Sequence, residues 1–269
     1  MKNLSCLISF YEKDDPVFLD EAFQSILGQT HRASEVVLVQ DGPVTDELHE
    51  VVSKWKNQLP IRHFINKTNL GLGRSLTLGI KKCKGEIVAR MDADDICHPE
   101  RFEKQMKFLM EHPDISVVGS WIAEFEGSIS NIRSYRELPA SHKELFSFAR
   151  KRCPLNHPTV MYRKAHILQV GNYDKFKNQQ DYHLWVRLLN EGYKISNIQE
   201  SLLYMRISSD LFKRRGGWKY FMIEWEVQRD FLKMSFIGPV EFIRNIFVRG
   251  VVRMLPNFVR EKIYMKGLR

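Results

Sequence analysis

The ten residues Glu86–Asp95, EIVARMDADD, decide the fold of this chain of 269 residues. The run EIVARM is mostly apolar and has the pattern of a strand buried inside a sheet. Three carboxylates, Asp92, Asp94 and Asp95, follow it directly, so the strand ends in a polar turn. Ligands of parallel α/β sheets bind at the carboxyl ends of the strands. This stretch therefore predicts a buried strand with a binding site at its end.

The residues before this stretch alternate between apolar runs and helical patterns. In chain order we expect a strand, a helix, a strand, a helix, a strand and a helix over Leu4–Phe10, about Pro16 to Gly28, Glu35–Gln40, Val44–Gln58, Ile61–Ile65 and Gly73–Lys82. Such alternation is typical of βαβ units and a mostly parallel sheet, so the predicted fold class is α/β. The polar turns Tyr11-Glu12 and Asp41-Gly42 should then lie beside the acidic turn.

The second half of the chain continues this pattern less regularly. Helices are expected over Pro99–Glu111 and Gln180–Glu191, and strands over Ile115–Phe125 and Tyr193–Tyr204. Residues 126–156 have no clear pattern and are expected to be loop with some helix.

Composition excludes several classes of protein. With 43% hydrophobic and 27% charged residues, the chain is neither collagen-like nor disordered, and it has no uncharged apolar run long enough for a polytopic membrane protein. The first residues, MKNLSCLISFYEKDD, meet Asp14 and Asp15 without a cleavage site and are typical of a first strand, not of a signal peptide. Four widely separated cysteines indicate reduced thiols in a cytosolic compartment.

Positive charge is concentrated near the C-terminus. Residues 201–269 hold 14 Lys/Arg and 6 Asp/Glu, a balance of +8, which leaves +1 of the total +9 for residues 1–200. This distribution indicates either an anionic surface or partner for the tail or a solvated basic face.

The acidic turn is the sharpest candidate site. Three adjacent carboxylates repel one another, and a hard divalent cation such as Mg²⁺ or Mn²⁺ relieves that repulsion. The alternative is a solvated acidic turn in which Asp95 or His98 caps the helix that starts near Pro99.

A second candidate is the glycine turn Gly71–Leu76, GLGRSL. Leu76 stands where a dinucleotide-binding loop has its third glycine, and the chain has no G-K-[ST] phosphate loop. Both nucleotide-loop classes are therefore excluded. Arg74 in the first turn of a helix could attract a diphosphate, or it could be a surface residue on an ordinary turn.

Two further candidates lie later in the chain. Asp181 starts an amphipathic helix, where it is either a cap or a general base that faces the acidic turn. His157, before Pro158, is either a satisfied loop residue or part of a site. No Ser-His-Asp or Cys-His arrangement is supported, which disfavours a covalent hydrolase.

Taken together, these residues resemble an inverting family 2 glycosyltransferase over about residues 3–206. The matching elements, in order, are Tyr11, Gln29-Thr30, Asp41-Gly42, Asn69-x-Gly71, the D-x-D of Asp92 and Asp94, His157-Pro158, and Asp181 with Leu184-Trp185. The resemblance implies a GT-A fold, a nucleotide-diphospho-sugar donor and a divalent cation, Mn²⁺ or Mg²⁺.

The resemblance also assigns roles to residues. It implies that Tyr11 and Asp41 hold uracil and ribose, that Asp92 frames the ribose and diphosphate, that Asp94 holds the metal, and that Asp181 is the catalytic base. The donor set further includes Asn69, Arg74 and Arg206, and the remaining site residues are Asp95, His157 and Trp185. The sequence departs from the family pattern at Gln180, where a Glu is usual, and after Arg206, where a His is usual.

The C-terminal residues divide the chain into a predicted catalytic domain, residues 1–206, and a basic amphipathic helical extension, residues 207–269. The basic run Lys213-Arg214-Arg215 and several aromatic residues precede a helical stretch that Pro256 should interrupt. One face of that stretch is predicted to carry Ile243, Phe247, Val251, Met254, Leu255 and Phe258, with Arg249, Arg253 and Arg260 opposite. This pattern favours an anionic membrane surface, and the alternative is an ordinary helix packed on the catalytic domain. No recognition module supports nucleic acid as a partner.

The overall resemblance is to bacterial enzymes that extend undecaprenyl-diphosphate sugars. It implies transfer of glucose or galactose from a UDP-hexose, β-1,3 onto GlcNAc-diphospho-undecaprenol, in O-antigen or polysaccharide biosynthesis, by an enzyme peripheral to the cytoplasmic face of the membrane. Two other classes remain: a sugar-phosphate nucleotidyltransferase, although its G-x-G-T-R-like loop is absent from Ser9–Asp15, and a non-catalytic saccharide- or membrane-binding module.

Overall fold

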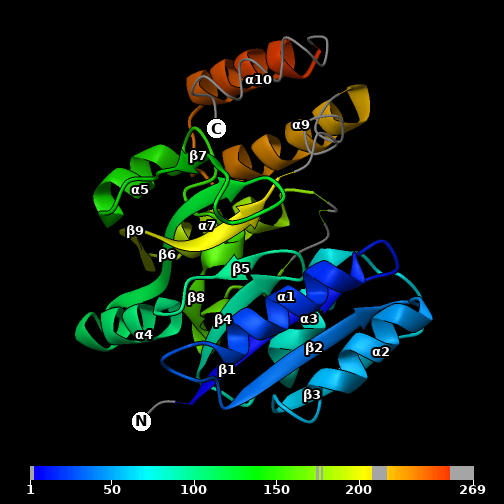
Figure 1. Cartoon of the computed structure of the whole chain (residues 1–269). Coiled ribbons are helices and arrows are strands. Elements are labelled where there is room, and N and C mark those ends of the chain that lie inside the picture. The colour runs from blue at the N-terminus through cyan, green and yellow to red at the C-terminus, as the bar shows by residue number, and fades with distance from the viewer. Residues whose placement is uncertain (1–2, 174–175, 177, 208–216, 255–269) are drawn as a thin grey trace.

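The computed structural model describes residues 3–173, 176, 178–207 and 217–254, and these residues form one sheet flanked by helices (Figure 1). The sheet contains β1 (Leu4–Phe10), β2 (Glu35–Asp41), β3 (Ile61–Asn66), β4 (Ile87–Asp92), β5 (Ile96–Cys97), β6 (Ile115–Phe125), β7 (Ile132–Arg136), β8 (Met161–Arg163) and β9 (Lys194–Arg206). The helices before β9 are α1 (Pro16–Leu27), α2 (Asp46–Trp55), α3 (Leu72–Lys82), α4 (Arg101–Glu111), α5 (His142–Ala149), α6 (Lys164–Gln169) and α7 (Gln180–Asn190). They are followed by α9 (Trp218–Lys233) and α10 (Pro239–Met254).

The strand order is β3-β2-β1-β4-β8-β6-β9-β5, with β7 paired to β6. The first four strands of this order, β3, β2, β1 and β4, are parallel, as the strand–helix alternation predicted. β8 lies antiparallel between β4 and β6, and β9 is parallel to β6. The predicted mixed, mostly parallel α/β sheet is therefore confirmed, and the parallel half brings the ends of β1, β2 and β4 to one edge.

Alternating side chains of the sheet form two apolar layers. Cys6, Ile8 and Phe10 of β1 pack toward α1, α2 and α4 on one face. Leu7 of β1, with Val37 and Val39 of β2, packs toward α3, α7 and α9 on the other. Because both faces are covered, the strands read as continuous apolar runs in the sequence.

Several elements differ from the sequence predictions, for reasons of length and exposure. β5 and β8 have two and three residues, too few for a periodic signal. β7 lies within the region left as loop; its residues alternate between exposed and half-buried, so it lacks an apolar run. α4 begins at Arg101 after the N-cap Glu100, which makes no side-chain cap. Of the two residues considered as a cap, Asp95 accepts from the amide of Arg206 instead, whereas His98 Nδ1 accepts a hydrogen bond from the amide of Glu100 at 3.3 Å, just before the helix.

The C-terminal helices pack on the rest of the protein. Phe231 of α9 lies 4.9 Å from the ring of Tyr182 in α7, and Phe236 lies 5.3 Å from Phe146 in α5, as measured between ring centroids. Arg150, after α5, forms an ion pair with Glu241 of α10. The predicted basic run at residues 213–215 and everything from residue 255, Pro256 included, lie outside the described residues.

No helix within the described part of the chain has the length and apolar character needed to cross a bilayer.

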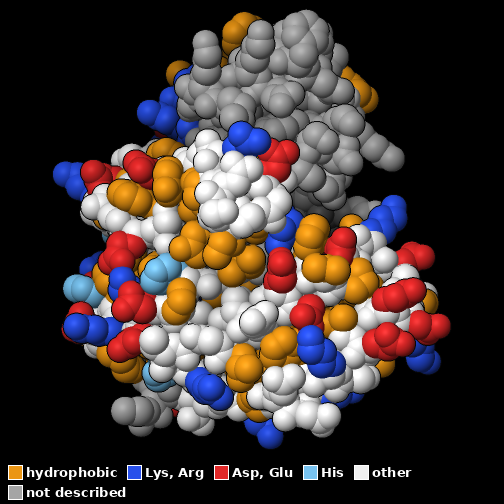
Figure 2. Space-filling model, in the orientation of Figure 1, with side chains coloured by type: hydrophobic (Ala, Val, Ile, Leu, Met, Phe, Trp, Pro, Cys, Tyr) orange, Lys and Arg blue, Asp and Glu red, His pale blue; other side chains and the backbone are white. Residues whose placement is uncertain are grey.

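Figure 2 shows the face of the molecule seen in Figure 1. Acidic and basic side chains are interspersed over the part of that face that carries β1–β4, in keeping with the small net charge of residues 1–200.

Gly85, in the turn before β4, lies against the backbone of β1. A Cβ atom added at this position would lie 2.6 Å from the carbonyl oxygen of Asn3 and 2.8 Å from the amide nitrogen of Ser5. We expect Gly85→Ala to lower the free energy of unfolding by about 1–3 kcal/mol, because backbone atoms cannot yield as a side chain can. Chemical denaturation measures this change.

Gly28→Ala is the matched control. Its nearest contact would be an ordinary 3.5 Å and its φ is −76°, so alanine fits without strain. We expect its stability to be unchanged or slightly raised. Equal loss of stability in both variants would contradict the argument.

Candidate functional site

A cavity of about 1070 Å³ lies at the carboxyl ends of the parallel strands. From the sequence-predicted site residues, it is lined by Tyr11, Asp41, Asn69, Asp92, Asp94, Asp95, His157, Asp181 and Arg206. The opposite wall comes from the segment after α5 and from α9 and α10, with Lys151, Arg152, Tyr220, Arg244 and Arg249 among its residues. The structure thus brings Asp92 and Asp181, which are far apart in the sequence, to one cavity.

Asp41 holds the loop before α3 in place. Its Oδ1 accepts hydrogen bonds from the amide of Leu70 and the Asn66 side chain, at 2.8 and 3.0 Å, and its Oδ2 accepts one from the amide of Gly71 at 2.8 Å. Gly42 has φ +94°, and a Cβ atom there would lie 2.7 Å from the amide nitrogen of Asn69. The close approach explains the Asp-Gly sequence at this turn.

Arg90, in β4, pairs with the first carboxylate of the acidic turn. Its guanidinium is 1% exposed and donates hydrogen bonds to both carboxylate oxygens of Asp92, one of them at 2.9 Å. Bidentate pairing fixes the orientation of the carboxylate as well as balancing its charge. Arg90 therefore positions Asp92 at the end of the buried strand.

Burial and the crowding of negative charge in the turn raise the pKa values of Asp94 and Asp95. Removal from water and repulsion by Asp92 raise the pKa of the Asp94 carboxyl to about 6. Burial, with the charges of Asp94 and Asp92, raises the pKa of Asp95 well above its usual range. The neighbouring Asp14 has a pKa of about 7, raised by burial and then by Asp94 and Asp92. The turn thus resists holding all its negative charge without a counter-ion.

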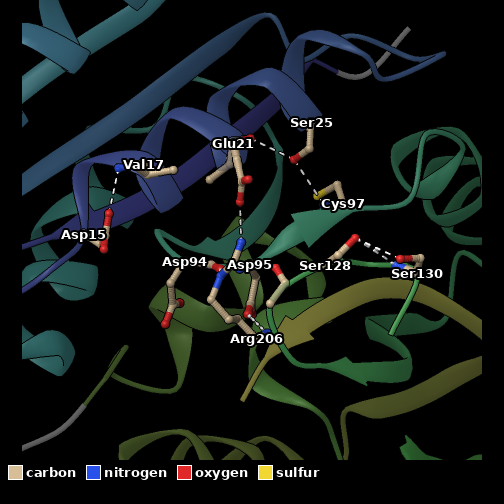
Figure 3. Close-up of polar contacts among 12 residues, drawn as sticks. Asp15, Val17, Glu21, Ser25, Asp94, Asp95, Cys97, Ser128, Ser130 and Arg206 are labelled. Atoms are coloured by element: carbon tan, nitrogen blue, oxygen red, sulfur yellow. Dashed lines mark hydrogen bonds and ion pairs between the residues drawn. The ribbon is translucent and has the colours of Figure 1, made fainter. Parts of the chain in front are cut away.

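Arg206, at the end of β9, clamps this turn (Figure 3). Its backbone amide donates to Asp95 Oδ1 at 3.1 Å and its Nε donates to the carbonyl oxygen of Asp94 at 3.2 Å. Its guanidinium also pairs with Glu21 of α1 and lies 3.8 Å from the ring centroid of Phe18. In this arrangement Arg206 orders the acidic turn, and the diphosphate contact that the resemblance implies for it stays a prediction.

The acidic turn fits a divalent cation. One carboxylate oxygen from each of Asp92, Asp94 and Asp95 lies within 4.8 Å of the others, and Asp94 is the most exposed of the three. Asp95 is 2% exposed, and its Oδ2 has no hydrogen-bond partner among the described residues. A cluster of hard oxygen donors with raised pKa values is the chemistry that Mg²⁺ and Mn²⁺ select.

Asp181 lies in the first turn of α7 on the other side of the cavity. The helix is preceded by Gln179, which has the left-handed φ of 63°, and Asp181 does not act as its N-cap. Cys153 lies close, with its Sγ 3.6 Å from Asp181 Oδ2. Burial and the charge of Asp181 raise the pKa of the Cys153 thiol well above its usual range, so the thiol remains protonated and donates to the carboxylate.

His157, Trp185 and Arg74 have more limited roles in the geometry. His157 lines the cavity and its Nε2 lies 2.7 Å from the Tyr173 hydroxyl, while burial and Arg90 hold its pKa well below the usual value. Trp185 is fully buried in the core, against the His157 ring. Arg74 is exposed on α3. Neither Trp185 nor Arg74 lines the cavity.

Sequence analysis missed several residues of the site. Arg90 carries a signal, because an arginine inside a buried strand requires a partner. Asp14, and Arg244 and Arg249 among the cavity-lining residues of α10, carry no such signal, since only the fold brings them to this cavity.

The chain matches the family model described as Glycosyl transferase family 2 over residues 5–171. It is 38% identical to an Escherichia coli protein named UDP-Gal:alpha-D-GlcNAc-diphosphoundecaprenol beta-1,3-galactosyltransferase, and the match covers 98% of this chain and 96% of that one. It is 36% identical to the amylovoran biosynthesis glycosyltransferase AmsE of Erwinia amylovora, over 97% of this chain and 98% of that one.

Solved structures share the fold at low sequence identity. S. aureus TarS 1-349 in complex with UDP-GlcNAc has a TM-score of 0.70 and 18% identity, covering 91% of this chain and 70% of that chain. The mannosyltransferase PcManGT from Pyrobaculum calidifontis, in complex with GDP-Man and Mn2+, has a TM-score of 0.64 and 14% identity, covering 98% and 73%. These likenesses confirm the expected GT-A fold.

The raised pKa values predict how cation binding depends on pH. The pKa of Asp94 is about 6, so below that pH protons compete with Mn²⁺ for the carboxylate. Above that pH the carboxylate is ionised and free to bind the cation. We expect the Mn²⁺ affinity to rise by about fourfold or more from pH 5.5 to 7.5. Titration calorimetry at these pH values measures it.

Asp94→Asn tests the same point through stability. A carboxyl whose pKa is raised on folding destabilises the protein as pH rises from its unfolded value of about 4 through the folded value. At pH 7.5 the metal-free variant should therefore melt about 2–4 °C higher than the unchanged protein and lose the stabilisation by Mn²⁺. Asp114→Asn, an exposed carboxylate paired with Lys194, should keep the Mn²⁺ effect. A metal-free melting point lowered by Asp94→Asn would contradict the repulsion.

Proposed function

Because this chain belongs to glycosyl transferase family 2, we propose that it transfers glucose or galactose from a UDP-hexose to a lipid-linked acceptor with inversion. The observation that carries the proposal is the single cavity in which the Asp92–Asp95 turn faces Asp181. The proposed product is a β-1,3 linkage to GlcNAc-diphospho-undecaprenol, and the proposed pathway is polysaccharide biosynthesis. The full-length likeness to the E. coli galactosyltransferase supports this acceptor.

The donor is proposed to lie along the ends of β1, β2 and β4. Tyr11 and Asp41 are on this side, beside the Asn69–Gly71 loop that Asp41 orders. A hexose nucleotide diphosphate placed there would direct its phosphates toward the acidic turn. Likeness to structures that bind UDP, UDP-GlcNAc or GDP-Man supports a nucleotide-sugar donor of this kind.

The charge of the leaving group is proposed to be met at the acidic turn. Asp94, with Asp95 and Asp92, would hold Mn²⁺ or Mg²⁺, which when bound neutralises the charge that develops on the departing diphosphate. Arg90 keeps the carboxylate of Asp92 in position for that task, and Arg206 does the same for the carboxylate of Asp95 and the backbone of Asp94.

Asp181 is proposed to accept the proton of the attacking hydroxyl. It reaches the cavity from α7, and the protonated Cys153 thiol beside it helps to orient its Oδ2. A single base without a covalent nucleophile gives one displacement at the anomeric carbon, so an α-linked donor gives a β-linked product.

α10 is proposed to contact the anionic inner surface of the cytoplasmic membrane. Val240, Ile243 and Phe247 share one face of the helix, and their side chains are 80%, 67% and 71% exposed. The neighbouring residues Arg244 and Val248 line the cavity. An apolar helix face beside the mouth of the site would place the cavity against the lipid that carries the acceptor.

A panel of UDP-sugars tests the proposed activity. The full-length protein is assayed with GlcNAc-diphosphate on a lipid analogue, with and without Mn²⁺, and the linkage of the product is determined. Transfer of one hexose with β-1,3 linkage supports the proposal. Failure to bind UDP in the presence of Mn²⁺ would overturn it.

Asp181→Asn should remove the base and leave the donor site intact. We expect kcat to fall by about 10²–10⁴-fold, because a positioned general base contributes that much, with UDP affinity unchanged. Glu191→Gln, the same change at the far end of α7, is the control and should keep full activity. An unchanged kcat in Asp181→Asn would refute the role of the carboxylate.

Ile243→Ser combined with Phe247→Ser should weaken membrane binding. We expect at least about tenfold weaker sedimentation with phosphatidylglycerol vesicles, since two large apolar side chains no longer enter the lipid. Ile65→Ser, which changes a side chain 60% exposed on β3, is the control. Equal vesicle binding by all three proteins would show that this face is not the contact.

A further inference from the structure

We infer that the wall of the cavity built by Lys151 and Arg244, with Arg152 beside them, is a subsite for the diphosphate group of the acceptor. This inference rests on the proposed function, because it takes the acceptor to be a sugar joined to a lipid through a diphosphate. It concerns a different part of the cavity from the acidic turn, and a different anion from the donor.

The segment after α5 brings these cations close to the base. Cys153 contacts Asp181, with 3.6 Å between Sγ and Oδ2. Lys151 is two residues earlier, so its Cα lies within about 7 Å of the Cα of Cys153. An acceptor sugar whose hydroxyl meets Asp181 carries its diphosphate one sugar ring away, toward this segment.

One stripe of side chains on α10 holds the segment after α5 in place. Glu241, Asn245 and Arg249 are spaced four residues apart and so lie on one face of the helix. Glu241 forms an ion pair with Arg150, Asn245 donates to the carbonyl oxygen of Arg150 at 2.9 Å, and Arg249 donates to the carbonyl oxygen of Lys151. The backbone that carries Lys151 is therefore held on consecutive turns of the helix.

The charges of this wall divide into structural and exposed groups. Arg249 is paired with Glu224, whose side chain is fully buried and also accepts a hydrogen bond from Gln179 at 2.7 Å. This pair cannot supply an open positive charge. Lys151 and Arg244 are both exposed and line the cavity. Arg244 donates to the side-chain oxygen of Asn245 at 2.9 Å, and its charge also helps to lower the pKa of Glu241, whose carboxylate forms its ion pair with Arg150.

The acidic turn at the donor end of the cavity already has two arginine partners other than Lys151 and Arg244. Asp92 already has Arg90, and the carbonyl of Asp94 and the carboxylate of Asp95 have Arg206. Lys151 and Arg244 come instead from the wall of α5 and α10, next to the helix face proposed to meet the membrane. In an acceptor that enters the cavity from the membrane, the diphosphate lies between the lipid and the sugar. The diphosphate would therefore meet this wall while the sugar beyond it reached Asp181.

Binding measurements test the subsite without requiring turnover. The UDP-bound protein is titrated with two short-chain acceptor analogues, GlcNAc-α-diphosphate-alkyl and the phosphate-free GlcNAc-α-alkyl glycoside. We expect the diphosphate analogue to bind at least about tenfold more tightly, and this preference to decrease with added salt. The variant Lys151→Ala/Arg244→Ala should lose most of this preference and keep the same affinity for UDP.

Lys151→Arg and Lys107→Ala are the controls. Arginine keeps the charge and should keep most of the preference, and Lys107 lies on α4, away from the cavity. Equal binding of both analogues by the unchanged protein, or an undiminished preference in the double variant, would overturn the subsite. Weaker UDP binding in the double variant would assign the cations to the donor instead. Failure of hexose transfer despite a charge-dependent preference for the diphosphate analogue would contradict the proposed function alone.

Discussion

Repulsion among the carboxylates of Asp92, Asp94 and Asp95 is the constraint on which the site depends. The buried strand β4 delivers all three to the edge of the sheet, where burial and mutual charge raise the pKa values of Asp94 and Asp95. Two arginines hold the turn in this unfavourable state: Arg90 from the strand itself and Arg206 from β9. The fold thus places a dense group of oxygen donors at one point, and the repulsion among them destabilises the turn locally.

The cavity has two ends of different origin. The strands and loops of the first hundred residues build the end with the acidic turn, whereas the segment after α5 and the helix α10 build the cationic end. Asp181 stands between them on α7. The family model stops at residue 171, so both the proposed base and the cationic wall come from residues beyond it or near its end.

The side chains of α10 have three kinds of surroundings, which a simple division into apolar and basic sides does not describe. The stripe of Glu241, Asn245 and Arg249 packs inward on residues 150–151. Arg244 and Val248 line the cavity. Ile243 and Phe247, with Val240, face outward. Arg249, predicted to lie opposite the apolar residues of this helix, is paired with the buried Glu224 of α9.

The sequence by itself determined the parallel half of the fold and the acidic turn. Continuous apolar runs, helix patterns and the polar residues after each strand are local signals, and β1, β2, β3 and β4 lie within a residue or two of where these signals placed them. The sequence could also identify Asp41, Asp94 and Asp181 as candidate residues of the cavity, since each belongs to a motif.

Only the tertiary structure decided the rest. Short strands such as β5 and β8 exist because longer neighbours pair with them, and the tasks of Arg206 and Arg249 follow from contacts with residues far along the chain. Trp185 belongs to a motif but lies in the core, because the face of α7 that carries it turns away from the cavity. Contacts between distant segments depend on how helices pack across the sheet, and no local pattern of residues encodes that packing.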